Sequence, residues 1–217
     1  MASAIWLSMK VAVVATALNG LVGLPVAYLL ARRRFWGHGA LDLLVTLPLV
    51  LPPTVTGYYL IVLLGRRGVL GGPLYHATGW TVAFTWYAAV IAATVMALPL
   101  LVRTSRAAIE SVDRDLERAA YTLGRSEFRT ALEVTLPLAR NGILAGLVLA
   151  FARALGEFGA TLMLAGNIPG KTATVPLAIY TAVQVGETQE AVLLVGVLTA
   201  LSCGVLLVSS RLGARAT

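Results

Sequence analysis

Long apolar runs separated by short charged segments dominate the hydropathy pattern of this chain. Five of these runs are long enough, at about 20 residues, to cross the hydrocarbon core of a bilayer as helices. They cover residues 11–31, 43–64, 80–102, 141–166 and 191–210. A helix is expected because it satisfies its own backbone hydrogen bonds within lipid. The pattern therefore predicts an all-α integral membrane protein with about five transmembrane helices.

Several of these runs contain residues that interrupt a membrane helix, and the second and fourth runs contain the most. Pro48, Pro52 and Pro53 lie near the centre of the second run, where proline removes backbone donors and bends or breaks a helix. Such a break is either a packing kink or an unwound segment that exposes backbone groups to a substrate path. The fourth run contains Arg153 and Glu157, whose spacing of four places them on one helix face, where they can pair.

Composition and charge placement support this membrane assignment. Charged residues make up only 12% of the chain, whereas soluble domains contain about 25%, so an ordinary soluble enzyme is excluded. The net charge of +7 would suggest nucleic acid in a soluble protein. Here twelve of the 17 basic residues lie in segments 32–34, 103–140 and 211–215. The positive-inside rule places these segments in the cytoplasm, with the N-terminus outside and the C-terminus inside.

The longest charged segment, 103–140, is patterned as two short helices and not as a linker. Asp113 and Asp115 put negative charge at the start of the first helix, and Gly124 can end it. Ser126 can then cap a second helix. We expect a cytoplasmic helix-turn-helix with an apolar face, which either lies on the lipid surface or fills a groove on a partner.

The same segment resembles the E-A-A-x-x-x-G-x9-I-x-L-P signature of ABC importer permeases. Arg118 occupies a position where that family has Glu, and Glu117 stands one residue earlier; Val134 replaces Ile. The resemblance implies that this coupling loop docks on an ATPase subunit. The residues to which it assigns this coupling are Glu117, Ala119, Ala120, Gly124, Leu136 and Pro137.

Other motifs extend the resemblance over almost the whole chain. The sequences LPLVLPP, FARALGEFGAT and GNIPGKT are similar to those of molybdate importer permeases. The resemblance implies one permease domain, residues 1–217, with the type I importer fold, in the inner membrane. It implies as partners two ATPase subunits, an external substrate-binding protein and a second copy of the chain. The expected cargo is molybdate, with tungstate or sulfate as alternatives, and no metal or other cofactor is expected.

We expect the polar groups and prolines of the membrane region to line the translocation path or its gate. A charge at the centre of a membrane helix costs about 2.5–3.5 kcal/mol, so it faces a bundle interior or a watery path. The alternative is that Arg153 and Glu157 form a structural ion pair. A single paired arginine also leaves few donors for tight binding of a dianion, which predicts weak binding along the path. The path residues are Pro52, Pro53, Arg153, Glu157, Thr161 and Asn167.

Nothing in the sequence indicates catalysis by this chain. The segment Gly170-Lys171-Thr172 resembles the end of a phosphate-binding loop, but Ala165 occupies the position of the first glycine that the motif requires.

The apolar stretch 175–185 is too short to span a membrane and is predicted to be an external or re-entrant helix. Cys203 is expected to fill the core. A secondary transporter that works without an ATPase is the alternative from another class.

Overall fold

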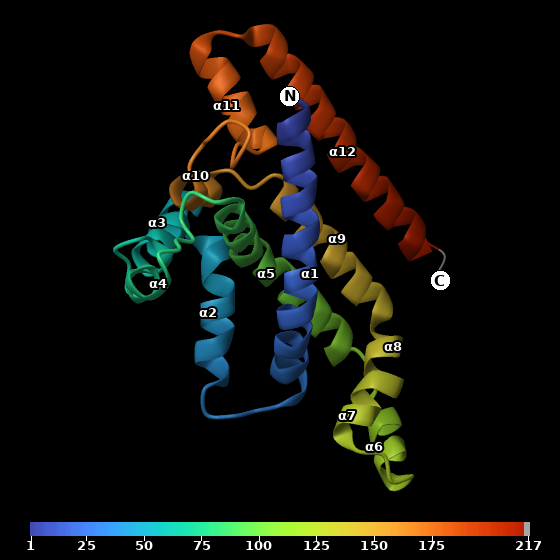
Figure 1. The fold of residues 1–217 in the computed structure, drawn as a ribbon. Helices are drawn as coiled ribbons and strands as arrows, with labels where there is room; N and C mark the ends of the chain where they lie inside the picture. The colour runs from blue at the N-terminus through green and yellow to red at the C-terminus, as the bar shows by residue number, and fades with distance from the viewer. Residues whose placement is uncertain (215–217) are drawn as a thin grey trace.

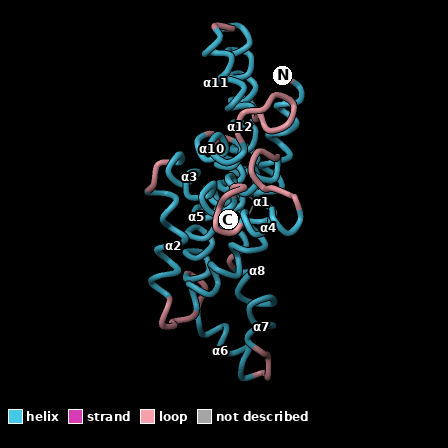
Figure 2. The backbone as a smooth tube through the Cα atoms, turned by 60° about the vertical axis from the view of Figure 1, so that its left-hand side comes forward, coloured by secondary structure: helices cyan, strands magenta, loops and turns pink. Residues whose placement is uncertain are grey.

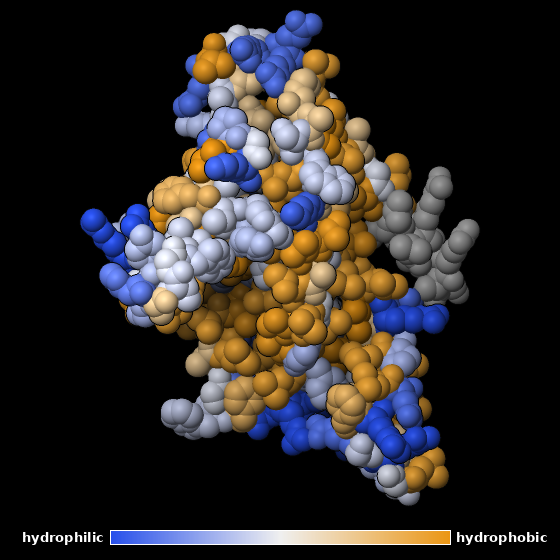
Figure 3. All heavy atoms as spheres, in the orientation of Figure 1, coloured by the Kyte–Doolittle hydropathy of each residue, from blue (hydrophilic) through white to orange (hydrophobic). Residues whose placement is uncertain are grey.

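The computed structural model describes the backbone of residues 1–214 and the side chains as far as residue 207. Every regular element within this range is helical, as the sequence predicts (Figures 1 and 2). Apolar residues form a broad area, the apolar band, in the middle of the visible face, and hydrophilic residues gather toward its two ends and at its left edge, where Figure 1 draws α4 (Gly71–Thr78) (Figure 3). This distribution is that of a protein that spans a membrane. The basic residues 211–215 of the predicted topology lie outside the described side chains.

Three helices are individually long and apolar enough to cross a membrane. They are α1 (Ala2–Arg32), α5 (Trp86–Glu110) and α12 (Thr188–Ala214), of which α12 was tested through Leu207. In the most apolar window of each helix, 61% of the α5 residues are buried but only 11% of the α12 residues. Helix α5 therefore forms the centre of the bundle, and α12 lies at its edge (Figure 1).

The second predicted span is broken where its prolines stand. Helix α2 (His38–Val50) ends before Leu51, and α3 (Pro53–Leu64) begins after Pro52. Neither half is long enough to span a bilayer alone.

A short helix, α4 (Gly71–Thr78), follows α3. Residues 80–85 then form a loop, so α5 starts six residues later than the predicted third span.

The fourth predicted span is also two helices and not one. Helix α9 (Arg140–Leu155) ends just before Gly156, and α10 (Gly159–Ala165) begins three residues later. The segment 175–185 forms α11 (Val175–Val185), as predicted, and leads into α12 at the end of the molecule where the N-terminus lies (Figure 1).

The predicted helix-turn-helix is present at the other end of the bundle. It consists of α6 (Arg114–Thr122), α7 (Glu127–Thr130), a π-helical turn η1 (Ala131–Thr135) and α8 (Leu136–Leu138). The Asp113 side chain accepts a hydrogen bond from the N–H of Asp115, and Ser126 accepts one from the N–H of Arg129. The chain then bends by 76° between the α7–α8 segment and α9. We call α6–α8 the coupling segment.

Small side chains let the central helices approach closely. Helix α5 contributes a series of fully buried alanines, namely Ala88, Ala89, Ala92, Ala93 and Ala97. On α9, a Cβ added to Gly142 would overlap the side chain of Ala108, and one at Gly146 would lie 3.0 Å from Leu101. Such close contact is how membrane helices associate without a hydrophobic driving force.

The prediction that Cys203 fills the core is wrong, because Cys203 is exposed on α12.

Candidate functional site

A buried ion pair attaches the coupling segment to the end of α1. A guanidinium nitrogen of Arg32, the last residue of α1, lies 3.0 Å from a carboxylate oxygen of Glu117 on α6. Their side chains are only 6% and 8% exposed. Glu117 is therefore engaged inside the chain in this structure, and it does not present its carboxylate at the surface.

Two further contacts extend this pair into a network. The Thr135 hydroxyl in η1 donates to the Glu117 carboxylate at 2.5 Å, and Arg32 donates to the carbonyl of Val112 at 3.0 Å. The network thus joins α1, the connection from α5 to α6, and η1. Partial burial raises the pKa of the neighbouring Tyr121 hydroxyl, and the carboxylates of Glu117 and Glu127 raise it further. Tyr121 is therefore a neutral phenol at physiological pH.

The opposite side of the coupling segment is apolar and exposed. Leu116, Leu123 and Phe128 are 49%, 83% and 73% exposed. Ala119 shares this exposure, whereas Ala120 is buried. Further along, Pro137 is exposed and Leu136 is partly buried. Large apolar side chains that protrude together beyond the membrane band are typical of a surface that binds another protein. We call Leu116, Ala119, Leu123 and Phe128 the apolar tip.

Gly124 makes the turn between the two helices of this segment. Its φ of +79° lies in the left-handed region, which side chains with a Cβ rarely adopt. The N–H of Gly124 donates to the carbonyl of Tyr121 at 3.0 Å, and the N–H of Arg125 donates to that of Ala120 at 3.1 Å. These bonds satisfy the end of α6 and fix the position of α7 relative to it.

A second polar cluster occupies the break between α9 and α10. Arg153 and Glu157 form the predicted pair, with a nitrogen–oxygen distance of 2.6 Å. The other carboxylate oxygen of Glu157 accepts the N–H of Ala160 at 2.8 Å, so Glu157 also caps the start of α10. Glu157 is 2% exposed, whereas the Arg153 side chain is 26% exposed. The cation thus reaches the surface of the chain, and the anion stays within it.

The far end of α10 is also fixed. The N–H of Phe84, in the loop before α5, donates to the carbonyl of Leu164 at 3.1 Å. Phe84 is the one residue other than glycine with a positive φ, 61°, in the described part of the chain. Backbone strain of this kind persists where surrounding contacts impose it. Both ends of α10 are therefore anchored by other segments.

The two helix breaks lie against each other. A Cβ on Gly159, the first residue of α10, would come within 2.9 Å of Pro53, the first residue of α3. One on Gly57 would come within 2.8 Å of the backbone of Ala160. Pro52 and Pro53 are exposed at this point. The structure thus brings together Pro52, Pro53, Arg153 and Glu157 of the predicted path residues at the α3–α10 contact.

Of the other two predicted path residues, Thr161 lies on α10 itself but is buried, and Asn167 lies beyond the end of α10. The Thr161 side chain is 1% exposed and packs within the bundle. The Asn167 amide donates to the hydroxyl of Thr181 on α11 at 2.7 Å. Asn167 also lines a cavity of about 280 Å³ that includes Met1 and Ser3, beside the N-terminus. The six residues therefore do not form one continuous site in this chain.

Sequence reasoning missed two features of these sites. It interpreted Arg32 only as part of a basic cytoplasmic segment. Glu117 lies far away in sequence, so no local pattern indicated that the two residues pair. It also assigned no role to Gly57. The close approach of Gly57 to Ala160 becomes visible only when the position of α10 beside α3 is known. Within the described residues, no three His, Cys, Asp or Glu side chains gather to hold a metal ion.

Solved structures of low sequence identity share this fold. The chain superimposes on a chain from an inward-facing structure of the MetNI methionine ABC transporter with a TM-score of 0.74, at 18% identity, over 99% of this chain and 94% of the other. A chain of a bacterial alginate ABC transporter, solved in complex with a periplasmic protein, gives a TM-score of 0.77 at 16% identity, over 99% and 78%.

Several curated proteins have much higher sequence identity to this chain than these solved structures have. The molybdenum transport system permease protein ModB of Escherichia coli (strain K12) is 51% identical over 181 residues, which are 83% of this chain and 79% of the relative. The protein of that name from Azotobacter vinelandii is 41% identical over 195 residues, 89% and 86% of the two chains. Residues 23–215 match the family model described as binding-protein-dependent transport system inner membrane component. This chain belongs to that family, as a multi-pass membrane permease and not an enzyme.

Proposed function

We propose that this chain is the membrane subunit of an ATP-driven importer of molybdate. The observation that carries the proposal is identity of 41–51% to molybdenum permeases over more than four fifths of the chain, including both helix breaks and the coupling segment. The cytoplasmic face would be the end with α6–α8, since the basic residues of segments 32–34 and 103–140 lie there. The N-terminus would then be external and the C-terminus cytoplasmic.

The partners follow from the surfaces that the chain exposes. The apolar tip would dock on one of two cytosolic ATPase subunits, each paired with one of two copies of this chain. An external substrate-binding protein would deliver the anion at the end formed by α11 and the N-terminus. The relationship to a family named for binding-protein-dependent transport supports this arrangement.

The coupling would depend on the Arg32–Glu117–Thr135 network. Because Glu117 is buried against α1, a displacement of α6 by the ATPase would be transmitted to the first helix of the bundle and, through η1, to α9. Glu117 would thus connect the coupling segment to the rest of the bundle, while the apolar tip would make the contact with the ATPase. Alternating access would follow from these rigid-body movements.

The anion would pass beside the α3–α10 contact. Here the exposed part of Arg153 adds positive charge, and the first turn of α3 presents the positive end of a 12-residue helix. Glu157 neutralises much of this charge, which favours passage over tight retention. Arg153 and Glu157 would therefore form part of a gate that holds the dianion weakly.

Competition for uptake tests the identity of the cargo. Cells that depend on this permease are given labelled molybdate with an excess of tungstate, sulfate or unlabelled molybdate. We expect unlabelled molybdate to suppress the uptake most strongly and sulfate to have little effect. Equal or stronger suppression by sulfate would assign the chain to sulfate transport.

Substitution of Gly124 separates this mechanism from transport without an ATPase. A β-branched residue is strained at a φ of +79°, so Gly124→Val should displace α7 from α6, whereas Gly124→Asn should be tolerated. We expect the valine variant to lose ATP-driven uptake while it remains folded in the membrane. Unchanged uptake in that variant would favour the secondary transporter.

A further inference from the structure

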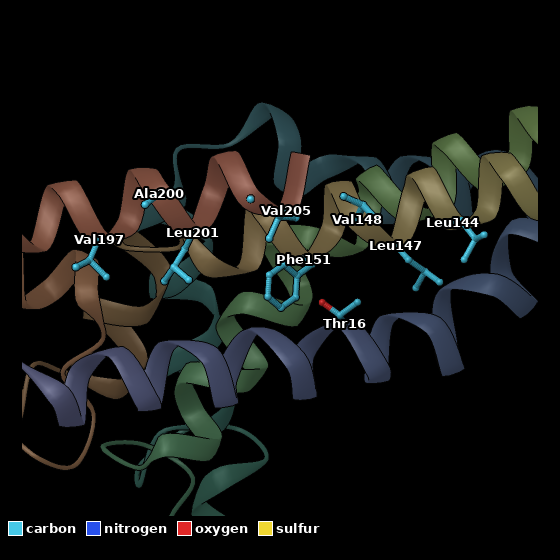
Figure 4. Close-up of a pocket in the computed structure, with 10 residues that line it drawn as sticks. Thr16, Leu144, Leu147, Val148, Phe151, Val197, Ala200, Leu201 and Val205 are labelled. Atoms are coloured by element: carbon cyan, nitrogen blue, oxygen red, sulfur yellow. The ribbon is translucent and has the colours of Figure 1, made fainter. Parts of the chain in front are cut away.

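An apolar groove runs along the outside of the bundle between three helices. Its volume is about 740 Å³, and α1, α9 and α12 form its walls (Figure 4). Figure 4 shows the side chains of α9 and α12 along its length, from Val197 at one end to Leu144 at the other. The lining residues are Thr16, Leu144, Leu147, Val148, Phe151, Val197, Ala200, Leu201, Gly204 and Val205.

The groove offers nothing polar to an occupant. Thr16 is the one lining residue with a polar side chain, and its hydroxyl donates to the carbonyl of Ala12 at 2.7 Å. A water molecule in such a space would lack the two to four partners that buried waters need. The groove therefore suits a long apolar chain, and it lies within the apolar band of the molecule.

A free cation stands about one helical turn beyond the end of the groove. Arg140 is the first residue of α9, and Leu144, Leu147, Val148 and Phe151 follow it at spacings that place all five on the same helix face. Arg140 is exposed, and it has no ion-pair or hydrogen-bond partner among the residues whose side chains are described. The chain bends by 76° just before it, where α9 leaves the coupling segment and enters the apolar band.

We infer that this groove binds an anionic phospholipid from the leaflet beside the coupling segment. The phosphate of the lipid would lie at Arg140, and one acyl chain would extend along α9 past Leu144 and Phe151 toward α12. This occupant matches both parts of the site, a cation at the membrane boundary and an apolar space that leads away from it. A soluble anion would leave the groove empty. A zwitterionic lipid carries its own ammonium group, which offsets the attraction of its phosphate to Arg140, whereas an anionic lipid keeps a net negative charge there. The lipid would also fill the space behind α12, of whose most apolar window only 11% is buried.

The chain offers two substitutions that test the acyl-chain half of the site. Gly204 lines the groove, and a Cβ added there meets no atom within 4 Å, so Gly204→Phe can fill the space without distorting α12. Gly196 lies on the same helix with equally open surroundings but does not line the groove. Gly196→Phe is therefore the matched control. Arg140→Gln and Arg140→Lys test the headgroup half in the same way.

The experiment uses the assembled transporter in nanodiscs that contain phosphatidylethanolamine and phosphatidylglycerol in a 3:1 ratio. Native mass spectrometry then reports the lipids that each chain retains and the oligomeric state. We expect one phosphatidylglycerol per chain, held in preference to phosphatidylethanolamine. Arg140→Gln should weaken its retention about fivefold, and Arg140→Lys much less. Gly204→Phe should abolish retention, and Gly196→Phe should leave it unchanged.

Three results would overturn the inference. Equal retention of both lipids, or equal effects of Gly204→Phe and Gly196→Phe, would show that the groove does not select an anionic lipid. Dissociation of paired chains by Gly204→Phe alone would show that the groove holds a second copy of the chain. None of these results would affect the proposed transport of molybdate, because the groove is lined by α1, α9 and α12 and not by α3 or α10.

Discussion

Arg32 and Glu117 form a buried ion pair with a separation of 3.0 Å, although one ends the first helix and the other lies in the coupling segment. A buried carboxylate is stable only with partners, and Arg32 and Thr135 both provide them. This pair explains how a segment of short helices outside the apolar band keeps a defined orientation. It also means that a force on α6 acts directly on α1.

Removal of one member of this pair should destabilise the permease strongly. Glu117→Ala leaves the Arg32 charge buried without its partner, which typically costs about 3–5 kcal/mol of stability. We expect a clear fall in the melting temperature of the detergent-solubilised protein. The control is Arg118→Ala, which breaks the exposed pair with Asp115 and should cost at most about 1 kcal/mol. Similar melting temperatures for both variants would contradict a structural role for the buried pair.

The contact between α3 and α10 should not tolerate a side chain at Gly57. In Gly57→Ala the new methyl group would overlap the Ala160 backbone and the Met163 side chain, which cannot move without displacing α10. Overpacking of this kind costs about 1–3 kcal/mol. Thermal unfolding should therefore begin at a lower temperature than in the wild type. Gly196→Ala, on open surface, should melt as the wild type does, and an equally stable Gly57→Ala would show that the two breaks are loosely packed.

Neutral variants of Arg153 and Glu157 distinguish a gate from a packing contact. Each single variant, Arg153→Gln or Glu157→Gln, leaves a charge without its partner and should lower stability. The double variant removes both charges, while the amide oxygen introduced by Glu157→Gln could still accept the N–H of Ala160, so stability should recover. If the pair gates the path, molybdate uptake stays low in the double variant. Recovery of uptake together with stability would mean that the pair serves packing alone.

The apolar tip should matter for ATP-driven transport and not for folding. Leu123 and Phe128 are 83% and 73% exposed, so Leu123→Ser and Phe128→Ser remove little buried surface. At an interface, loss of such a side chain often costs about 1–2 kcal/mol, and we expect about tenfold weaker association with the ATPase. Pull-down of the ATPase with the tagged permease measures this. Leu70→Ser, on the exposed connection from α3 to α4, is the control and should leave association intact.

Hydropathy and capping residues predicted much of the fold because both act locally. The apolar runs located α1, α5 and α12, and Asp113, Gly124 and Ser126 marked the ends of α6 and α7. The prolines at 52 and 53 indicated the break between α2 and α3. The same method overextended the fourth span, because a continuous apolar run does not show that Glu157 turns back to cap a new helix.

The site was less predictable because it depends on contacts between distant segments. The spacing of Arg153 and Glu157 revealed their pairing, since the two residues are four apart in sequence. No spacing rule connects Arg32 with Glu117, or Gly57 with Ala160, and the basic triplet at 32–34 had a sufficient explanation as a topology signal. Thr161 and Asn167 were grouped with Arg153 as polar groups of the membrane region, but the turn after α10 brings Asn167 to Thr181 on α11.

The most direct test of the account is uptake by the reconstituted transporter. The permease is placed in proteoliposomes with its ATPase, and labelled molybdate is supplied with the substrate-binding protein. We predict that molybdate accumulates only when ATP and the binding protein are both present, and that Gly124→Val abolishes this accumulation. Accumulation that continues without ATP, or that follows an ion gradient instead, would contradict the account.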